Sequence, residues 1–265
     1  MQTVRQARRM PVGWGSKDLW LRRRDLKSEG IIQFVSERGE TGGIIDYVLL
    51  GRLHMKRFAA FAVLALIAIV PLFAQVPKDW KLRIDRSTSA EDPDAAGAIK
   101  FMPAGSGFHV ITPQAAVFWN PANTATGNYT LKSTFTLTKS TGYLEYYGLI
   151  FGGSNLEGAG QEYLYFVITD DGTWLVKRRM GGSAQEVSDK TSSPAVKKPD
   201  AKGTCTNALE VRVMADKIDF VINGMVVKTL PKTGAAAKTD GIYGLRVNHH
   251  LDVQVDGFGV SKNPA

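Results

Sequence analysis

Short runs in which apolar and polar residues alternate recur between residues 98 and 260, and Gly, Asn, Asp and Pro separate them. No stretch after residue 75 keeps helical apolar spacing for more than a turn or two, so the alternation predicts an all-β fold. A dozen strands in one domain require two stacked sheets. The predicted strands are Ala98–Met102, Gly107–Ile111, Ala115–Trp119, Asn128–Leu137, Tyr146–Phe151, Tyr163–Thr169, Thr173–Arg179, Leu209–Met214, Lys217–Ile222, Met225–Leu230, Ile242–Asn248 and Leu251–Val260. Residues 181–206, rich in Ser, Lys and Pro, predict a surface loop around one weak strand near Ala184–Ser188.

Two dipeptides, Asn223-Gly224 and Asp171-Gly172, predict hairpins with two-residue turns, because they supply the positive φ angles that such turns need. The second turn would set Asp170 opposite Thr173. A slip of one residue in that turn would exchange the two faces of the strand pair. With the predicted register, one face carries Tyr163, Tyr165, Val167, Trp174, Val176 and Arg178. Both faces are partly apolar, so we expect cover on both sides, with one side as the floor of a ligand groove.

An export leader is predicted from the basic start Met55-Lys56-Arg57, the apolar run Phe58–Phe73 and the small residue at Ala74. We expect cleavage after Ala74, although Leu72 stands where a small residue is more usual. Residues 1–54 then form a disordered upstream extension from a misplaced start codon. Their 10 Lys+Arg and 6 Asp+Glu show little sustained periodicity.

The alternative is that the same apolar run anchors the chain in a membrane, with its basic residues inside. The run of about 16 residues contains Pro71 and is shorter than the roughly 20 residues of a spanning helix. We therefore expect a secreted or periplasmic bacterial protein with no stable membrane anchor after cleavage. Its single β-sandwich domain would span residues 75–265.

Charge and cysteine content exclude two protein classes. The whole chain carries a net charge of +8, but residues 75–265 hold 21 Lys+Arg against 19 Asp+Glu, a net of about +2. Only Lys177-Arg178-Arg179 and Lys197-Lys198 form basic runs, so we expect no nucleic-acid partner. Cys205 is the only cysteine, which excludes an intramolecular disulfide and therefore a small disulfide-stapled scaffold. Stability must come from a packed core, for which this length suffices.

Several segments carry a resemblance to a known family: Tyr147-Gly148-Leu149-Ile150-Phe151-Gly152-Gly153, Tyr163-Leu164-Tyr165-Phe166, Asp171-Gly172, Lys177-Arg178-Arg179 and Val255-Asp256-Gly257-Phe258. Residues 80–262 resemble the concanavalin A-like lectin/glucanase superfamily. Within it they are similar to bacterial secreted domains of the 3-keto-disaccharide hydrolase (DUF1080) type. The resemblance implies a jelly-roll β-sandwich of two antiparallel sheets. Its members include lectins, glycan-binding modules and glycoside hydrolases, and fold alone does not choose among them.

Paired carboxylates suited to glycoside hydrolysis are not evident. The pattern Glu-x-Asp-x-x-Glu of the laminarinase-like glucanases is absent. Asp252 and Asp256 share a strand face but would lie roughly 13 Å apart at about 3.3 Å per residue. Retention requires about 5–5.5 Å and inversion about 6.5–9.5 Å. Glu157 and Glu162 flank the loop Gly158-Ala159-Gly160 and would meet only if that loop folded back, so no catalytic residue is predicted.

Nucleophile and metal motifs are also missing. The chain has no Gly-x-Ser-x-Gly elbow, and Cys205 lies in a polar stretch without a nearby histidine. His109, His249 and His250 lack ligand spacing, so a zinc site would have to be assembled by tertiary contacts alone. The segment Glu91-Asp92-Pro93-Asp94 has oxygen ligands for calcium but not the spacing of a calcium loop. We expect neither a metal nor a cofactor.

Carbohydrate recognition uses flat aromatic rings against sugar faces, and Arg, Asn or His side chains that hydrogen-bond hydroxyl groups. Several residues of these types can converge in the fold. The predicted ligand-binding residues are Trp119, Tyr165, Trp174, Arg178, Arg246, Asn248 and His249. Each also has a structural explanation, since Trp174 suits a core and residues 248–250 suit a turn.

The favoured prediction is a non-catalytic domain that binds glycan or another carbohydrate on a concave sheet face. The first alternative is a glycoside hydrolase of the 3-keto-disaccharide hydrolase type, and the second is a structural or adhesive envelope domain. A carboxylate meeting a second carboxylate or a histidine in a cleft would favour the enzyme. A groove of aromatic rings and Arg without such a pair would favour binding.

Overall fold

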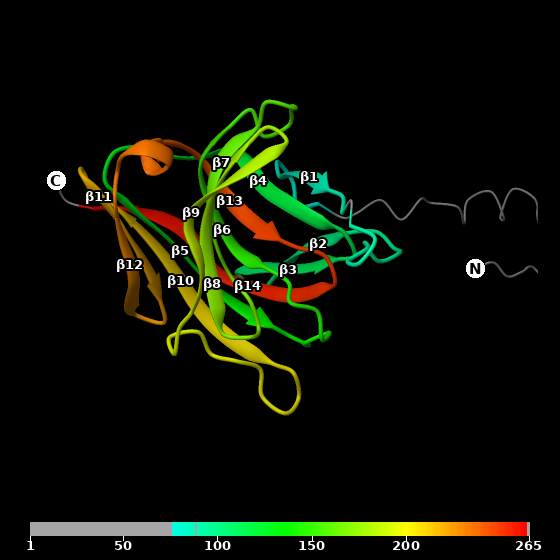
Figure 1. Cartoon of the computed structure of the whole chain (residues 1–265). Helices are drawn as coiled ribbons and strands as arrows, with labels where there is room; N and C mark the ends of the chain where they lie inside the picture. Colours follow the sequence, from blue (N-terminus) through cyan, green and yellow to red (C-terminus); the bar gives the residue numbers. More distant parts are fainter. Residues whose placement is uncertain (1–75, 88, 264–265) are drawn as a thin grey trace, which may run out of the picture. The chain divides into compact units, whose positions relative to one another are not determined.

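The computed structural model describes residues 76–87 and 89–263, which form two seven-stranded antiparallel sheets packed as a sandwich (Figure 1). The fold class predicted from the sequence is confirmed. Sheet A has the order β1 (Lys81–Asp85), β4 (Ala115–Ala125), β13 (Gly241–Val247), β6 (Tyr147–Ser154), β7 (Glu162–Ile168), β8 (Thr173–Met180) and β9 (Ser183–Ser192). Sheet B has the order β12 (Met225–Pro231), β11 (Lys217–Ile222), β10 (Cys205–Val213), β5 (Tyr129–Leu137), β14 (Leu251–Lys262), β3 (Gly107–Thr112) and β2 (Lys100–Ala104). A single 3-10 turn, η1, spans Gly234–Ala236 in the described part of the chain.

The chain passes repeatedly from one sheet to the other, as Figure 1 shows for β3 to β6 and for β13 to β14. The predicted leader (55–74) and the upstream extension (1–54) lie outside the described residues. Within residues 76–87 and 89–263, no helix has the length and apolarity to span a membrane.

The core lies between the sheets, because alternate residues of each strand point inward. In β5 the odd positions Tyr129, Leu131, Phe135 and Leu137 are fully buried, while the even positions are half-buried or exposed. Strands β6 and β7 of sheet A and β10 and β11 of sheet B also supply buried side chains to this core. Burial of this apolar area, at about 25 cal/mol per Å², is the main stabilising term.

Sheet A is apolar on its outer face too. A second cluster of buried side chains lies there, separate from the core between the sheets. Its members are Val117, Trp119, Ile150, Leu156, Tyr163, Tyr165, Val167 and Leu175. This explains why β6 and β7 are almost continuously buried instead of alternating. The expectation that the strands around Asp171-Gly172 are covered on both faces is confirmed.

The register predicted at Asp171-Gly172 is wrong by one residue. Ile168 pairs with Trp174, so the loop has three residues, 170–172, and Gly172 takes a φ of +90°. Such a loop is favoured here because the Asp171 carboxylate accepts hydrogen bonds from the Thr173 amide at 3.0 Å and the Thr173 hydroxyl at 2.6 Å. The slip moves Trp174, Val176 and Arg178 to the inner side of sheet A. The Asn223-Gly224 turn has the predicted two residues, with φ of 50° and 82°.

Each of the dozen predicted runs overlaps an observed strand, but two features were not predicted. Strand β1 was missed, and β9 runs over Ser183–Ser192, well beyond the weak strand expected near Ala184–Ser188. Strand β1 pairs with the edge of β4 and sets Asp85 opposite Ala115. It thereby adds a charged border to the outer face of sheet A.

Candidate functional site

A hollow of about 180 Å³ opens on the outer face of sheet A. Strands β7, β8 and β13 and the residues flanking β6 and β13 supply its walls. We call it the arginine hollow, and its lining residues are Tyr146, Tyr165, Leu175, Lys177, Arg246 and Asn248. Three of these six, Tyr165, Arg246 and Asn248, are predicted ligand-binding residues.

Arg246 is held firmly at the centre of this face. Its Nη1 donates to Asp85 Oδ2 at 2.8 Å and to the Tyr163 hydroxyl at 2.9 Å, and its guanidinium carbon lies 5.2 Å from the centre of the Tyr165 ring. Burial alone would lower the pKa of Arg246, but Tyr163 and Asp85 outweigh it and raise the pKa above its usual value. The guanidinium is therefore a fixed positive charge. Within the described residues, its hydrogen bonds use Nη1 alone, which leaves Nε and Nη2 as donors.

A larger hollow of about 500 Å³ lies on the same face, between Trp119, Ile242 and the loop that carries Asn155 to Gly160. This loop is tied to β1, because Lys81 pairs with Glu157 and Arg83 donates to the Gly158 carbonyl. Trp119 is only 2% exposed, so it forms the wall of the hollow and does not present a free ring face.

Two predicted ligand-binding residues, Trp174 and Arg178, are not on this face. Trp174 is 2% exposed and packs edge-on against Phe166 in the core, with ring centres 6.1 Å apart. Arg178 lies at the border of the inner side, 3.6 Å from Glu162 and 3.3 Å from the Ala235 carbonyl. Both errors follow from the register slip at the 170–172 loop.

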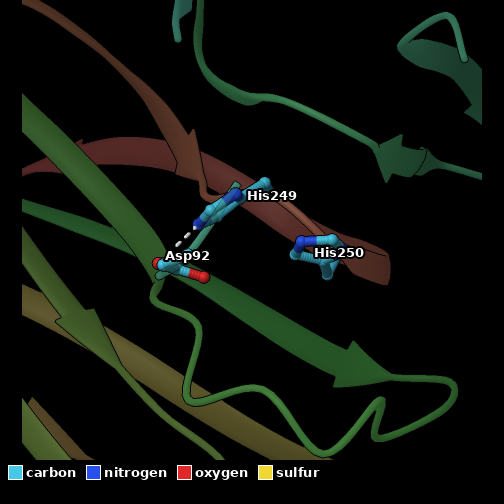
Figure 2. Close-up of side chains that lie close together, drawn as sticks. All are labelled: Asp92, His249 and His250. Atoms are coloured by element: carbon cyan, nitrogen blue, oxygen red, sulfur yellow. Dashed lines mark hydrogen bonds and ion pairs between the residues drawn. The ribbon is translucent and has the colours of Figure 1, made fainter. Parts of the chain in front are cut away.

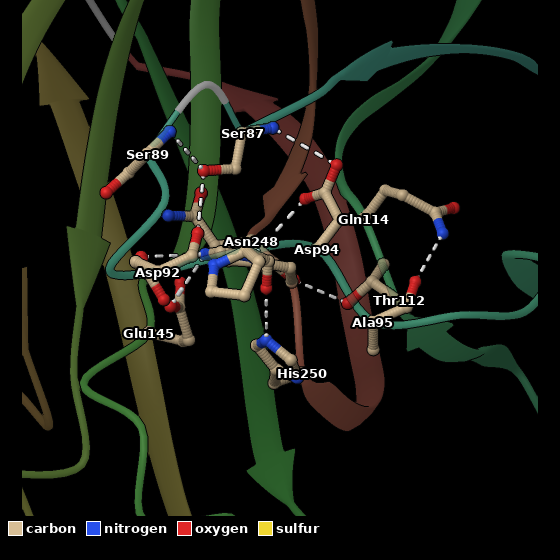
Figure 3. Close-up of polar contacts among 12 residues, drawn as sticks. Ser87, Ser89, Asp92, Asp94, Ala95, Thr112, Gln114, Glu145, Asn248 and His250 are labelled. Carbon is tan, nitrogen blue, oxygen red and sulfur yellow. Dashed lines mark hydrogen bonds and ion pairs between the residues drawn. The ribbon is translucent and has the colours of Figure 1, made fainter. Parts of the chain in front are cut away.

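His249, the last predicted site residue, is itself buried and lies in a group of polar side chains that follows Asn248 of the arginine hollow. Its Nε2 is 2.8 Å from Glu145 Oε1 and 3.1 Å from Asp92 Oδ2, and its Nδ1 is 3.3 Å from Asp94 Oδ1. We call Asp92, Asp94, Glu145, His249 and His250 the acid–histidine cluster. Figure 3 shows the polar contacts by which the segment from Ser87 to Ala95 reaches the turn at 248–250.

Glu145 is the most perturbed carboxyl group of this cluster. Burial, with a smaller contribution from the charge of Asp92, raises its pKa to about 7, against the opposing effects of Asn248 and Arg246. Glu145 is 4% exposed and His249 is 5% exposed. A carboxyl group and an imidazole therefore meet here, but beneath the surface, and neither lines the two hollows.

Sequence reasoning missed Asp92, Asp94 and Glu145, because no local pattern links them to residue 249. The one signal was the acidic segment 91–94. The other carboxylates that we weighed do not pair with each other. Glu162 binds Lys238 at 2.8 Å, and Asp252 lies 2.7 Å from His109 on the neighbouring strand.

No protein-family model matches this sequence, and no curated protein matches it. Solved structures do match in fold. The carbohydrate-binding module CBM66 from Bacillus subtilis is 10% identical, with a TM-score of 0.50 over 72% of this chain and all of that one. A Bacillus subtilis protein of unknown function with a galectin-like fold is 15% identical, with a TM-score of 0.49 over 70% and 90% of the two chains. A family 16 endo-glucanase from Bacteroides ovatus is 10% identical, with a TM-score of 0.49 over 70% and 94%.

None of these three is a 3-keto-disaccharide hydrolase, so that finer resemblance stays a prediction. At such low sequence identity, similarity to a solved structure indicates a shared fold but not a shared activity. The chain thus has an antiparallel two-sheet β-sandwich fold similar to that of CBM66.

Proposed function

We propose that the protein binds carbohydrate in the arginine hollow and does not cleave it. The observation that carries this proposal is the convergence of Arg246, Lys177 and Asn248 with the rings of Tyr146 and Tyr165 around one hollow. Small-molecule sites typically combine apolar and aromatic walls with a few placed polar groups. Sugars offer both an apolar ring face and hydroxyl groups.

The polar groups of the hollow have hydrogen-bonding capacity left for a ligand. Arg246 keeps Nε and Nη2, and Lys177 is partly engaged by Glu186 at 3.3 Å. Asn248 adds a side-chain amide to the lining of the hollow.

The size of the hollow favours a small ligand unit. Its volume of about 180 Å³ lies below the roughly 300–1,000 Å³ typical of pockets for drug-sized ligands. We therefore take one sugar unit, at the end or along the side of a glycan, as the occupant. The likeness in fold to CBM66, a module named for carbohydrate binding, supports this class of ligand.

The hydrolase alternative would need an acid and a base that reach the glycosidic bond. Glu145 and His249 meet, but with 4% and 5% exposure they do not reach a ligand in either hollow. The structural or adhesive alternative would need no ligand at all. One experiment distinguishes both alternatives from binding without cleavage.

That experiment is a glycan-array screen of the purified protein, followed by calorimetry and a hydrolysis assay on the same hits. We expect binding without turnover. The double substitution Lys177→Ala and Asn248→Ala should weaken binding at least tenfold. The matched control, Lys132→Ala on the outer side of sheet B, should leave affinity unchanged. Turnover abolished by Glu145→Gln would establish the hydrolase, and no binding to any glycan would overturn the proposal.

We also infer export, on the strength of the leader predicted at residues 55–74. N-terminal sequencing of protein recovered outside the cytoplasm should give Gln75 as the first residue. Recovery of the uncleaved chain in the membrane fraction would support the anchor instead.

A further inference from the structure

Three potential metal ligands meet in the acid–histidine cluster. Asp92, His249 and His250 each place one ligand atom within 4.8 Å of the others (Figure 2). They come from two segments far apart in the sequence, the connection between β1 and β2 and the turn between β13 and β14. Figure 2 shows the Asp92 carboxylate facing the His249 ring, with His250 next to it.

The two nitrogens of His249 face different carboxylates. Nε2 faces Asp92 and Glu145, and Nδ1 lies 3.3 Å from Asp94 Oδ1. Within the described residues, both Nδ1 and Asp94 Oδ1 are buried without a hydrogen-bond partner. If Nε2 carries the proton, two lone pairs face each other at that contact. A metal ion on Nε2 would require the proton on Nδ1, which could then donate to Asp94.

This division of roles is the usual one for a metal-binding histidine, whose second nitrogen donates to a carboxylate that orients the ring. The His249 side chain is 6% exposed, and Asp94 is 15% exposed. The pair is therefore shielded from water, which could otherwise satisfy the two unpaired atoms. A proton on Nδ1 that is donated to Asp94 would pair both atoms and would leave the Nε2 lone pair free to bind a metal ion.

His250 is held in a strained backbone conformation. Its φ is +58°, a conformation that non-glycine residues rarely adopt. Its Nε2 donates to the Pro93 carbonyl at 2.9 Å, and its ring stacks on Tyr143 with centres 4.2 Å apart. These contacts keep the His250 ring 4.8 Å from the His249 ring. Two adjacent imidazoles are thus directed to the same acidic segment.

We propose that this cluster binds a divalent transition-metal ion of the zinc class, with Asp92, His249 and His250 as ligands and Asp94 as the orienting carboxylate of His249. Imidazole nitrogens suit zinc and its neighbours, whereas calcium prefers oxygen ligands alone. Glu145 lies on the Nε2 side of His249 and is positioned to be the fourth ligand. Tetrahedral bonds of about 2.0–2.1 Å would draw the ligand atoms to roughly 3.3 Å apart, a small contraction of the present cluster.

The ion would be structural, because four protein ligands would leave it without the open position that catalytic sites keep. The ion would fasten the segment around Asp92 to the 248–250 turn, directly beside Asn248 of the arginine hollow. This inference is independent of the proposed carbohydrate binding, since it can be tested without any glycan.

The test is a calorimetric titration of chelator-treated protein with ZnCl₂, and separately with CaCl₂, together with the absorption spectrum of the cobalt(II) form. We expect one zinc ion per chain and no comparable binding of calcium. Asp92→Asn and His250→Gly should each weaken zinc binding more than about 100-fold, and Asp94→Asn about 10–100-fold. Glycine suits the positive φ at position 250, so that variant should still fold.

His109→Ala is the matched control, because His109 also pairs with an aspartate, 2.7 Å from Asp252, but outside the cluster. It should bind zinc like the original protein. Zinc binding that survives both Asp92→Asn and His250→Gly, or that is lost in His109→Ala, would overturn the site. Absence of zinc binding would overturn it too.

Discussion

Asn248 and His249 are neighbours in the chain but belong to two regions of opposite character. Asn248 lines the arginine hollow together with Arg246 and Lys177. His249 is 5% exposed and lies among Asp92, Asp94 and Glu145. Both regions combine cationic and acidic groups. The difference is that the Lys177 side chain in the hollow is 27% exposed, whereas Glu145 and His249 in the cluster are buried and contact each other.

This difference separates two roles. Accessible donors around a hollow can exchange water for the hydroxyl groups of a ligand, so their removal should change affinity and leave stability nearly unaltered. Groups that are buried together must satisfy one another, so the removal of one leaves the others uncompensated. The comparison therefore predicts large effects on stability in the cluster and effects on binding in the hollow.

The largest effect is expected for His249→Ala. Loss of the imidazole would remove the shared partner of Asp94 and Glu145, and a buried carboxylate left without its partner costs about 3–5 kcal/mol of unfolding free energy. Urea unfolding at neutral pH with an unchanged m-value measures it. In the control, the His109–Asp252 pair is about one-third exposed. His109→Ala should therefore cost less than about 1 kcal/mol of unfolding free energy. Equal losses at both positions would remove the distinction between the two regions.

Arg246→Lys should reduce carbohydrate affinity by about 2 kcal/mol, or roughly 30-fold. Lysine keeps the charge but cannot contact Asp85, Tyr163 and a ligand at once with its single ammonium group. Calorimetry with the best array ligand measures this. An affinity unchanged by the substitution would mean that the ligand does not use the guanidinium.

Lys177→Ala should weaken binding by about 1 kcal/mol, close to fivefold, and change stability by less than about 0.5 kcal/mol. Its side chain is 27% exposed and forms one ion pair, with Glu186. Binding and urea unfolding measured on the same preparation give both numbers. A larger loss of stability than of affinity would place Lys177 with the structural residues.

The smallest effect concerns the turn that decides which side chains of β8 reach the hollow. Burial would raise the pKa of Asp171, but hydrogen bonds from Thr169 and Thr173 and the charge of Lys190 lower it to about 2. A lowered folded-state pKa stabilises the fold above the usual value of 3.8 and ceases to do so as the pH falls toward 2.

Asp171→Asn should therefore cost about 1 kcal/mol at pH 7 and almost nothing at pH 2. Urea unfolding at several pH values gives the comparison. A difference that does not depend on pH would mean that the carboxylate charge does not hold the three-residue loop.

The sandwich could be predicted from the sequence because alternation is a local signal, and each of the dozen predicted runs overlaps a strand. The placement of Tyr163 and Tyr165 on one face followed from the same alternation. Strand β1 was missed although Leu82 and Ile84 alternate with charged residues, because five residues carry little periodic signal. Trp174 and Arg178 were misplaced because Asp171 stabilises a loop one residue longer than the dipeptide suggested. The contacts of His249 with Asp92 and Glu145 join distant segments, so no local pattern contained them.

The most direct test of the central claim, that the arginine hollow is the ligand site, is NMR of the isotope-labelled protein titrated with its best array ligand. Shift changes should concentrate at Tyr146, Tyr165, Lys177, Arg246 and Asn248, and signals from the outer side of sheet B should not move. Changes that concentrate on sheet B would contradict the account.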